Sequence, residues 1–562
     1  MSNRLARWAG FVAVVAGVAG FHAVGSPSTA QDAPTVKVKN PLLPVDKNDV
    51  ETSFLACSQC HNEKYPIDVK GNRFAKLVKS HEFVLLGEGR TWNEQDPHSK
   101  SFDVLRRPLG QQMSKLLKYD VTKAPQCLTC HAIDKNPGAP LPALPEEIPA
   151  RFDRSEGVTC SACHGIRKPW QTEHFADKEG DDARRTIPWR IKLPAEKEQS
   201  GLRNLRDPGV KANLCASCHV GSAVEHKVVT HEMYAAGHPP LPPFELGTFM
   251  ECQPKHWGYP INPELKFFTP KEFEAYAGKP FVEAHPNWTW ELYRFHPADQ
   301  EVYLARAVAA GAVASLGAEM RMIAADADAA LVAEKQMLPT EGVDYARFDC
   351  YACHHDLRVP SDRQARGYEG GKPGRPTLKA WVAALPGVVA THAVSLPPLA
   401  DTAKTFDAKW AAVRMAAVAR PFGDPKQLSS AAADMAKWCD EFVAKSTADG
   451  KPLYTQEQAT KLLAVIGEAA TSPKWTADPE AAMHLTWAYI TLKGGVDRAP
   501  VPDTALESLK STIPVRVRFP PYSTPEGEPQ PAGVQIGPRL ELFRKYQSKD
   551  FIEKFKALTG GK

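Results

Sequence analysis

Hydrophobic positions in the C-terminal third of the chain recur with the period of an α-helix. Between residues 378 and 495 they form several amphipathic segments, which are separated by Gly- and Pro-containing turns. The pattern is clearest at 405–419, 428–446 and 480–492. Each of these segments is long enough for at least three helical turns. We therefore predict a helical region here.

Two further stretches outside this region also predict helices. An Ala-rich segment at 301–335 favours one or two helices, and a Pro-rich loop at 519–531 precedes a last helix at 538–558. No segment keeps up the two-residue alternation of a β-strand. The chain also contains 49 prolines, which interrupt regular elements. The predicted fold class is mainly α with extensive irregular loops.

The N-terminus has the three parts of an export signal. Arg4 and Arg7 form a positive start, residues 9–21 form a short apolar run, and small residues up to Ala30 provide a cleavage site before Gln31. The alternative is an uncleaved membrane anchor. The run is shorter than the roughly 20 residues that a membrane span needs, and it is interrupted by glycines, so we favour cleavage. We expect a periplasmic or otherwise exported protein, with no other segment that crosses a bilayer.

Composition narrows the choice of partners. Hydrophobic residues make up 43% of the 562 residues and charged residues 24%, as in soluble globular proteins. The net charge of +4 is too small to indicate a nucleic-acid or membrane surface as the partner. We expect no nucleic acid, and membrane contact only by association or through an uncleaved anchor.

Ten of the 12 cysteines fall into five C-x-x-C-H patterns, the attachment signature of c-type heme. Two thiols three residues apart lie on one side of a helical turn, where each can add to a heme vinyl group. The histidine that follows can then bind the iron as its proximal ligand. The sequence therefore predicts five covalently attached hemes c. In chain order, motifs one to five are Cys57/Cys60/His61, Cys127/Cys130/His131, Cys160/Cys163/His164, Cys215/Cys218/His219 and Cys350/Cys353/His354.

Other uses of cysteine fit this pattern less well. Zinc ribbons employ paired C-x-x-C units, so five units, each followed by histidine, are a poor match. A thioredoxin-like dithiol needs one motif in a βαβ setting, and disulfides do not explain the histidines. The two remaining cysteines, Cys252 and Cys439, could pair or stay as separate thiols, and we assign them no role.

The sixth iron ligands have to come from histidines outside the motifs. His231 and His238 are seven residues apart, so one helix ended by Pro239 would present both on the same face, with Gly237 leaving room for a flat macrocycle. His98 is expected near the start of a helix at 99–107. His174 follows motif three, close to a tryptophan. These four are the predicted distal ligands, and most hemes are expected to be His/His ligated.

The remaining histidines and methionines have weaker local arguments. His355 directly follows His354 and points away around the helix, so it cannot bind the same iron, although it could bind another. No methionine stands at an obvious ligand spacing. The other weaker candidates are His81, His226, His256, His285 and His296.

Four stretches carry a resemblance to a known family: Asp96 to Phe102, Gly157 to Gly165, Cys218 to Ser222 and His231 to Pro239. Through them the segment from about 54 to 260 resembles the cytochrome c-554 family of exported multiheme cytochromes. That resemblance implies closely packed, mostly His/His-ligated hemes that relay electrons, sometimes with one five-coordinate site, and it supports His98 and His174 as distal ligands. The named member of the family has four hemes, so a fifth motif and a long C-terminal helical region are departures.

These features predict four parts of the chain: a signal peptide at 1–30, a linker at 31–47, a pentaheme cytochrome c-554-like domain at 48–365 and a heme-free helical domain at 366–562. The expected function is electron transfer between redox partner proteins. One alternative is a multiheme redox enzyme acting on a small nitrogen or sulfur species at a five-coordinate heme, since four distal candidates serve five irons. A third interpretation is a subunit that docks through its C-terminal helices.

Overall fold

The computed structural model describes residues 57, 61, 88–132, 154–165, 170, 194–254, 301–338, 342–361, 363–364, 367, 373–448, 452–517 and 537–559. Within these ranges the protein is mainly α-helical. The described residues form two isolated β-bridges, Ser222–Lys227 and Phe348–Leu378, and no strand. The predicted fold class, mainly α with irregular loops, is confirmed.

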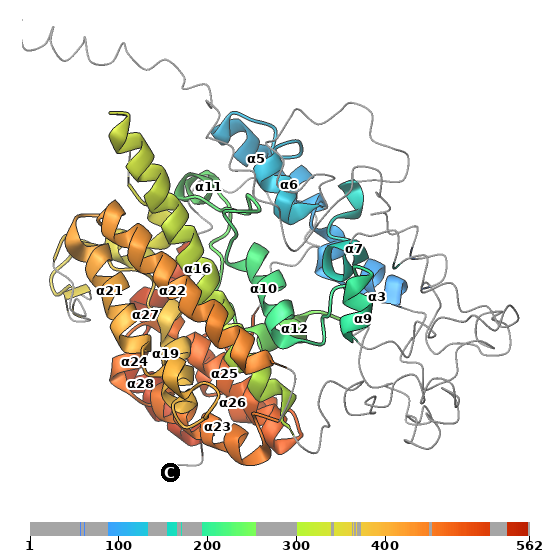
Figure 1. The fold of residues 1–562 in the computed structure, drawn as a ribbon. Helices are drawn as coiled ribbons and strands as arrows, with labels where there is room; N and C mark the ends of the chain where they lie inside the picture. The colour runs from blue at the N-terminus through green and yellow to red at the C-terminus, as the bar shows by residue number, and fades with distance from the viewer. Residues whose placement is uncertain are drawn as a thin grey trace, which may run out of the picture.

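The N-terminal half consists of short helices, many of which begin at a proline in their first turn, where its missing N–H is not needed. In Figure 1 these blue and green helices lie on one side of the molecule. They are α3 (Glu88–Gln95), η1 (Pro97–Lys100), α4 (Asp103–Arg106), α5 (Pro108–Leu117), α6 (Pro125–His131), η2 (Arg154–Glu156), α7 (Cys160–His164), α9 (Pro194–Gln199), α10 (Pro208–His219), α11 (His231–Ala236) and α12 (Leu246–Cys252).

The C-terminal half is a bundle of longer helices, coloured yellow to red in Figure 1. Its elements are α16 (Tyr303–Lys335), η4 (Tyr345–Arg347), α17 (Cys350–Cys353), α19 (Trp381–Ala393), α20 (Ala400–Ala403), α21 (Phe406–Ala419), α22 (Pro425–Thr447), α23 (Gln456–Ala470), α24 (Pro473–Thr476), α25 (Pro479–Asp497), α26 (Asp503–Leu506), η5 (Leu509–Ser511), α27 (Gly537–Lys545) and α28 (Ser548–Leu558). The helices predicted at 405–419, 428–446 and 480–492 correspond to α21, α22 and α25.

Helix α16 connects the two halves. It contacts α10 and α12 of the N-terminal half, and α22, α19 and α25 of the bundle. The Ala-rich segment thus forms one helix of 33 residues. By length and composition this helix could span a membrane, but 89% of its apolar window is buried inside the protein. Its apolar character is therefore explained by its position in the core.

Small residues let α16 and α22 approach closely. A Cβ atom added at Gly317 of α16 would lie 3.0 Å from Cβ of Cys439 in α22. One core of buried side chains runs from Ala212 in α10 through α16 to Phe555 in α28. A smaller core lies under α4, α5 and α6. The helical bundle and the segment with motif four therefore share the same packed interior.

Two predicted helices are interrupted. The helix expected at 99–107 is divided into η1 and α4 around Ser101, whose hydroxyl donates to the His131 carbonyl at 2.9 Å. The helix expected at 538–558 is divided into α27 and α28 at Tyr546, whose buried hydroxyl donates to the Thr476 carbonyl at 2.6 Å. Cys252 and Cys439 are separate thiols and form no disulfide with each other.

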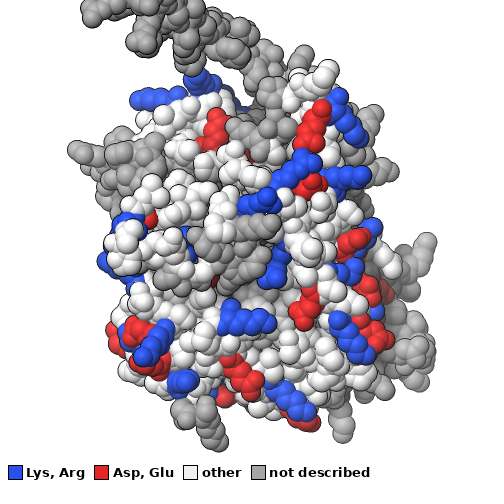
Figure 2. Space-filling view, turned by 90° about the vertical axis from the view of Figure 1, so that its left-hand side faces the viewer, with Lys and Arg blue, Asp and Glu red and all other residues white. Residues whose placement is uncertain are grey.

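The face of the bundle shown in Figure 2 carries Lys and Arg interspersed with Asp and Glu. Several exposed charges of the bundle helices form ion pairs one helical turn apart, such as Lys461–Glu457 at 2.6 Å in α23 and Lys445–Glu441 at 2.7 Å in α22. Exposed pairs of this kind add solubility and only a few tenths of a kcal/mol each.

Candidate functional site

The C-x-x-C-H motifs are built on short helices, as their spacing predicts. Three of the motif histidines are the last residue of their helix: His131 ends α6, His164 ends α7 and His219 ends α10. His354 directly follows α17 as its C-cap. The two cysteines and the histidine of each of these motifs therefore lie within about one and a half helical turns.

The motif thiols meet in two pairs. Cys57 of motif one and Cys160 of motif three are within hydrogen-bonding contact, and this contact and burial raise the pKa of Cys160. Cys130 of motif two likewise contacts Cys218 of motif four, which raises the pKa of Cys130. The attachment points of motifs one and three are therefore adjacent, and so are those of motifs two and four. The second thiol of motif one, Cys60, lies outside the described residues.

Three motif histidines each face a second histidine from elsewhere in the chain. The ring centres are 6.2 Å apart for His98 and His219, with an angle of 77° between the ring planes. For His131 and His238 they are 6.4 Å apart at 74°, and for His231 and His354 they are 6.2 Å apart at 25°. The motif histidines of these pairs belong to motifs four, two and five.

This spacing is the one expected for two imidazoles on opposite sides of a metal ion. A metal–imidazole bond is about 2 Å long and the nitrogen lies roughly 1 Å from the ring centre, so the two centres should be about 6 Å apart. Direct van der Waals stacking would bring rings closer. The separation therefore leaves room for an iron atom in each pair.

In several of these imidazoles, Nδ1 already has a hydrogen-bond partner on the side away from the facing ring. Nδ1 of His131 lies 2.7 Å from the Ser101 carbonyl, and Nδ1 of His238 lies 2.8 Å from the Pro239 carbonyl. A carbonyl oxygen can only accept, so each Nδ1 carries the proton. The lone pair is then on Nε2, which is the arrangement that a metal-binding histidine needs.

Burial keeps most of these imidazoles uncharged. Burial, together with the charge of the facing histidine, lowers the pKa of His219 to about 3 and that of His238 to about 4. Burial also lowers the pKa of His131 and of His354. Neutral rings have a free lone pair at neutral pH, as metal ligation requires.

His98 differs from these because its Nδ1 bonds to a carboxylate, Asp96, at 2.8 Å. Burial acts to lower the pKa of His98, but the hydrogen bond and the charge of Asp96 raise it. In the sequence, Asp96 stands only two residues before His98, and the Asp-Pro pair indicates the start of a helix. This pattern alone does not show that the carboxylate contacts the imidazole.

The predicted helix that carries both His231 and His238 on one face is wrong. Helix α11 ends at Ala236, and Gly237 (φ 119°) is its C-cap. Glycine is needed there to turn the chain, since this φ is costly for other residues, and a Cβ would lie 2.9 Å from Cδ1 of Leu109. Because of this turn, His231 and His238 reach motifs five and two.

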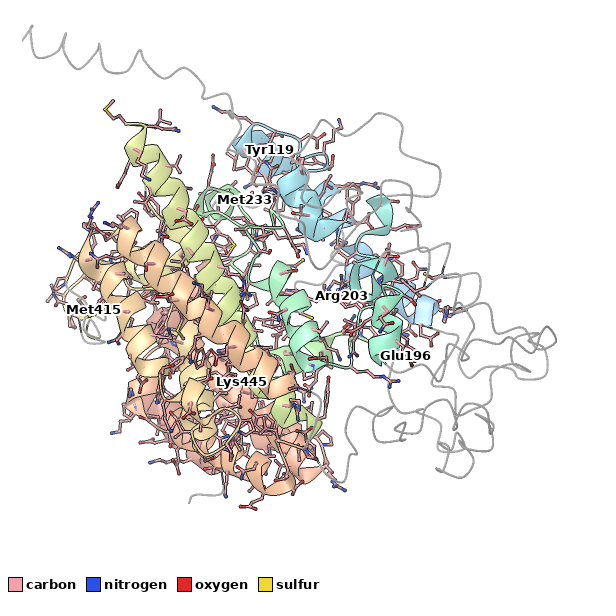
Figure 3. All side chains as sticks on the ribbon, viewed as in Figure 1. Tyr119, Glu196, Arg203, Met233, Met415 and Lys445 are labelled. Atoms are coloured by element: carbon pink, nitrogen blue, oxygen red, sulfur yellow. The ribbon has the colours of Figure 1, made fainter. Side chains whose placement is uncertain are left out.

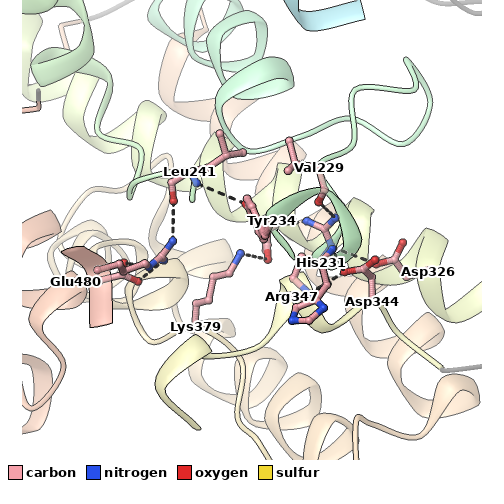
Figure 4. A network of polar contacts seen from close by, with 12 residues as sticks. Val229, His231, Tyr234, Leu241, Asp326, Asp344, Arg347, Lys379 and Glu480 are labelled. Atoms are coloured by element: carbon pink, nitrogen blue, oxygen red, sulfur yellow. Dashed lines mark hydrogen bonds and ion pairs between the residues drawn. The ribbon is translucent and has the colours of Figure 1, made fainter. Parts of the chain in front are cut away.

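Polar contacts fix His231 against the segment of motif five (Figure 4). The Asp344 carboxylate accepts from the backbone N–H of His231 at 3.0 Å and from that of Ala346 at 2.7 Å. Buried Arg347 donates to Asp326 at 3.1 Å and to the Val229 carbonyl at 3.2 Å. The start of α11 and the turn before motif five are thus held together.

The C-terminal helices anchor the same region from the other side. Arg539 in α27 pairs with Glu480 in α25 and donates to the Leu241 carbonyl at 3.1 Å (Figure 4). Burial acts to lower the pKa of Arg539, but its carboxylate partner raises it. Tyr351 of motif five stacks on Phe543 of α27 with ring centres 5.2 Å apart. The bundle therefore supports the pair formed by motif five.

Two residues that the sequence patterns do not single out tie further motifs together. The Ser101 hydroxyl donates to the His131 carbonyl at 2.9 Å and accepts from the backbone N–H of Val158 at 3.1 Å. Arg203, in the loop between α9 and α10 (Figure 3), donates to the carbonyls of Ala162 and Cys163 at 2.7 and 2.6 Å. These contacts join motif two to motif three and motif three to the approach of motif four.

Aromatic side chains enclose the histidine of motif four. His219 lies 4.8 Å from Phe249 and 6.2 Å from Phe244 between ring centres. Helix α12, which carries Phe249, is fixed to α25 by Glu245, whose carboxylate accepts from the Thr491 hydroxyl at 3.0 Å. Only the folded chain brings these residues together, so no local sequence signal could have identified them.

Taken together, the donor set fits covalently attached heme. Cysteine pairs on one side of a helical turn, each followed by an imidazole, provide attachment and a proximal ligand, and second imidazoles lie at the required separation at motifs two, four and five. His174, the fourth predicted distal ligand, lies outside the described residues.

Comparison with protein families gives one match. Residues 56–165, with motifs one to three, match the model of the family described as Cytochrome c554 and c-prime. This match supports a c-type cytochrome, a class with covalently bound heme c that takes part in electron transfer. Motifs four and five lie beyond the matched residues. No curated protein and no solved structure matches the chain.

Proposed function

We propose that the protein is an exported pentaheme cytochrome c that transfers electrons through closely packed, mostly His/His-ligated hemes. The observation that carries this proposal is the set of opposed imidazoles at motifs two, four and five. Heme iron, when bound, supplies a one-electron change between its ferric and ferrous states. Electron transfer needs no open coordination site, which agrees with two protein ligands for each of these irons.

The chain's own residues would hold each iron in nearly the same surroundings in both states. Thioether bonds from the ten motif cysteines would fix the macrocycles. The irons of the hemes attached at motifs two, four and five would be held by the imidazole pairs His131/His238, His219/His98 and His354/His231. Their rings are held from behind by backbone and carboxylate acceptors. Such preorganisation keeps ligand movement small during electron gain and loss.

The arrangement of the motifs supports a continuous route. Contacts between Cys57 and Cys160 and between Cys130 and Cys218 bring motif one to motif three and motif two to motif four. The segment with His231 and His238 connects motif five with motif two, and the contacts of the Ser101 hydroxyl join motif two to the start of motif three. Electrons would enter from and leave to redox partner proteins outside the cytoplasm, with the chain soluble after signal cleavage.

A redox enzyme acting on a small nitrogen or sulfur species would need an iron with an open site. His131, His219 and His354 each face a second imidazole, so such an iron would have to belong to motif one or motif three. The geometry at the other motifs favours electron transfer.

A pyridine hemochrome assay on the purified full-length protein tests the heme count. We expect five hemes c per chain, and four in a Cys350→Ala/Cys353→Ala variant. An unchanged count in the variant, or far fewer than five in the wild type, would contradict the proposal. N-terminal sequencing of the exported protein tests the expected start at Gln31.

A further inference from the structure

We infer that Asp96 is a positioning residue that lowers the reduction potential of the iron held between His98 and His219. The inference deepens the proposed function and rests on it, because it concerns a heme attached at motif four. Asp96 touches neither the iron nor the macrocycle, and acts through the imidazole of His98.

The Asp96 carboxylate is buried and fully engaged. Its Oδ1 accepts from the backbone N–H of His98 at 2.9 Å and lies 2.8 Å from Nδ1 of the same residue. Its Oδ2 accepts from the Gln253 side-chain amide at 3.1 Å. The side chain is only 1% exposed, so water does not screen its charge. The carboxylate also caps the helix η1 and thereby fixes the position of His98.

This acceptor differs from those at motif two. There His131 and His238 both direct Nδ1 to neutral backbone carbonyls, those of Ser101 and Pro239. At motif one, Nδ1 of His61 lies 3.0 Å from a carboxylate oxygen of Glu88, but that side chain is 19% exposed and more open to water. The Asp96 carboxylate is therefore the more deeply buried of these two charged acceptors, and the acceptors at motif two carry no charge.

A charged acceptor makes the imidazole a stronger electron donor. Asp96 draws the Nδ1 proton toward itself, which raises the basicity of Nε2. A more basic ligand, with a negative charge behind it, stabilises ferric iron more than ferrous iron. The affected step is the gain of one electron by ferric iron, with no bond formed or broken. The iron of motif four should therefore have a lower potential than that of motif two.

The substitution Asp96→Asn tests this idea. Asparagine keeps an oxygen acceptor for the backbone and for Nδ1 of His98 but removes the charge. In a spectroelectrochemical titration of the full-length protein, we expect one heme component to move to higher potential. Loss of such a partner typically lowers metal affinity by about 10–100-fold. A tenfold loss of affinity for ferric iron relative to ferrous iron raises the potential of a one-electron couple by about 59 mV. The His98→Ala variant assigns this component, because the heme attached at motif four should then change from low-spin to high-spin and lose its low-spin signal.

Two other variants serve as controls. Asp103→Asn removes the same charge from nearby α4, where the carboxylate is 43% exposed and lies 3.9 Å from Arg106, and it should leave the component unmoved. Gln253→Leu removes the donor that competes for Asp96, so it should move the component to lower potential. The opposite directions expected for Asp96→Asn and Gln253→Leu cannot arise from general loosening of the fold.

The inference is overturned if Asp96→Asn has its full heme content and shows no shift, or if Asp103→Asn moves the same component equally. If Asp96→Asn does not fold, the direction of the shift in Gln253→Leu decides: a lower potential supports the inference, and no change or a rise overturns it. Failure of the proposed function looks different. In that case the wild type lacks the hemes, or His98→Ala produces no high-spin iron.

Discussion

The imidazole of His98 faces that of His219 with ring centres 6.2 Å apart and an angle of 77° between their planes. One ring belongs to the short helix η1, and the other ends α10 as the histidine of motif four. His98 thus lies opposite a motif far away in the sequence rather than next to motif one or two, its neighbours along the chain.

Replacement of His238 by alanine should convert one heme from low-spin to high-spin. The ring centres of His131 and His238 are 6.4 Å apart, and the iron bound by His131 would lose the second imidazole. Electron paramagnetic resonance of the oxidised protein measures this change. A matched control is His226→Asn, since His226 is exposed and asparagine tolerates its left-handed backbone (φ 55°). Equal spectra for His238→Ala and the wild type would refute the assignment.

Gly237→Ala should destabilise the protein by about 1–3 kcal/mol, because the residue has φ 119° and a Cβ would lie 2.9 Å from Leu109. Gly494→Ala is the control. Gly494 lies in helix α25, and the atom nearest to an added Cβ would be the Ala499 carbonyl oxygen at 3.6 Å. Alanine at this position should therefore leave the stability of the protein unchanged or raise it by up to about 1 kcal/mol. Thermal unfolding followed by circular dichroism compares the two. A similar Tm change in both variants would show that the turn is not the cause.

Arg306→Ala should lower the free energy of unfolding by about 3–5 kcal/mol, because it leaves the buried carboxylate of Glu301 without its ion-pair partner. Arg306 also donates to the Ser446 carbonyl in α22. The matched control, Lys404→Ala, removes an exposed pair with Asp401 and should change stability by less than about 1 kcal/mol. Denaturant titration measures both. Comparable effects would mean that burial of the pair is unimportant.

His484 should make stability fall in weakly acidic solution. Burial lowers the pKa of this residue to about 4 in the folded protein, against 6.5 for the free side chain. Below 6.5 the unfolded chain binds the proton and the folded protein resists it, so stability is lost as pH falls from 6.5 toward 4. Above 6.5 both states are neutral and the residue has no pH effect.

The loss attributable to His484 should be about 3 kcal/mol between about pH 7 and about pH 4. His484→Gln, which does not titrate, should lack this part of the pH dependence when the free energy of unfolding is measured by denaturant titration. His226→Asn should retain it. If His484→Gln follows the wild-type curve at every pH, the interpretation fails.

Local patterns predicted much of the helical framework. The periodicity of 405–419, 428–446 and 480–492 sufficed, because amphipathic helices in a bundle repeat their apolar residues with the helical period. The breaks did not follow from periodicity. The Ser101 hydroxyl binds the His131 carbonyl, and Tyr546 binds the Thr476 carbonyl, and both contacts join segments distant in sequence.

The sequence predicts candidate residues for the site but not how the histidines pair. C-x-x-C-H spacing is local chemistry, so the attachment residues could be named directly. Which histidine faces which motif depends on the turn at Gly237 and on the packing of η1 against α10. The role of Asp96 was missed for the same reason, since a carboxylate near a histidine in sequence is most often only a helix cap.

The most direct test of the account is the electron paramagnetic resonance spectrum of the oxidised full-length protein. Crossed imidazole planes leave two iron orbitals nearly equal in energy, whereas aligned planes separate them. We predict strongly anisotropic low-spin signals from the pairs at 77° and 74° and a rhombic low-spin signal from His231 and His354 at 25°. A spectrum dominated by high-spin iron, with none of these low-spin signals, would contradict the assignment of the opposed histidines as axial ligands.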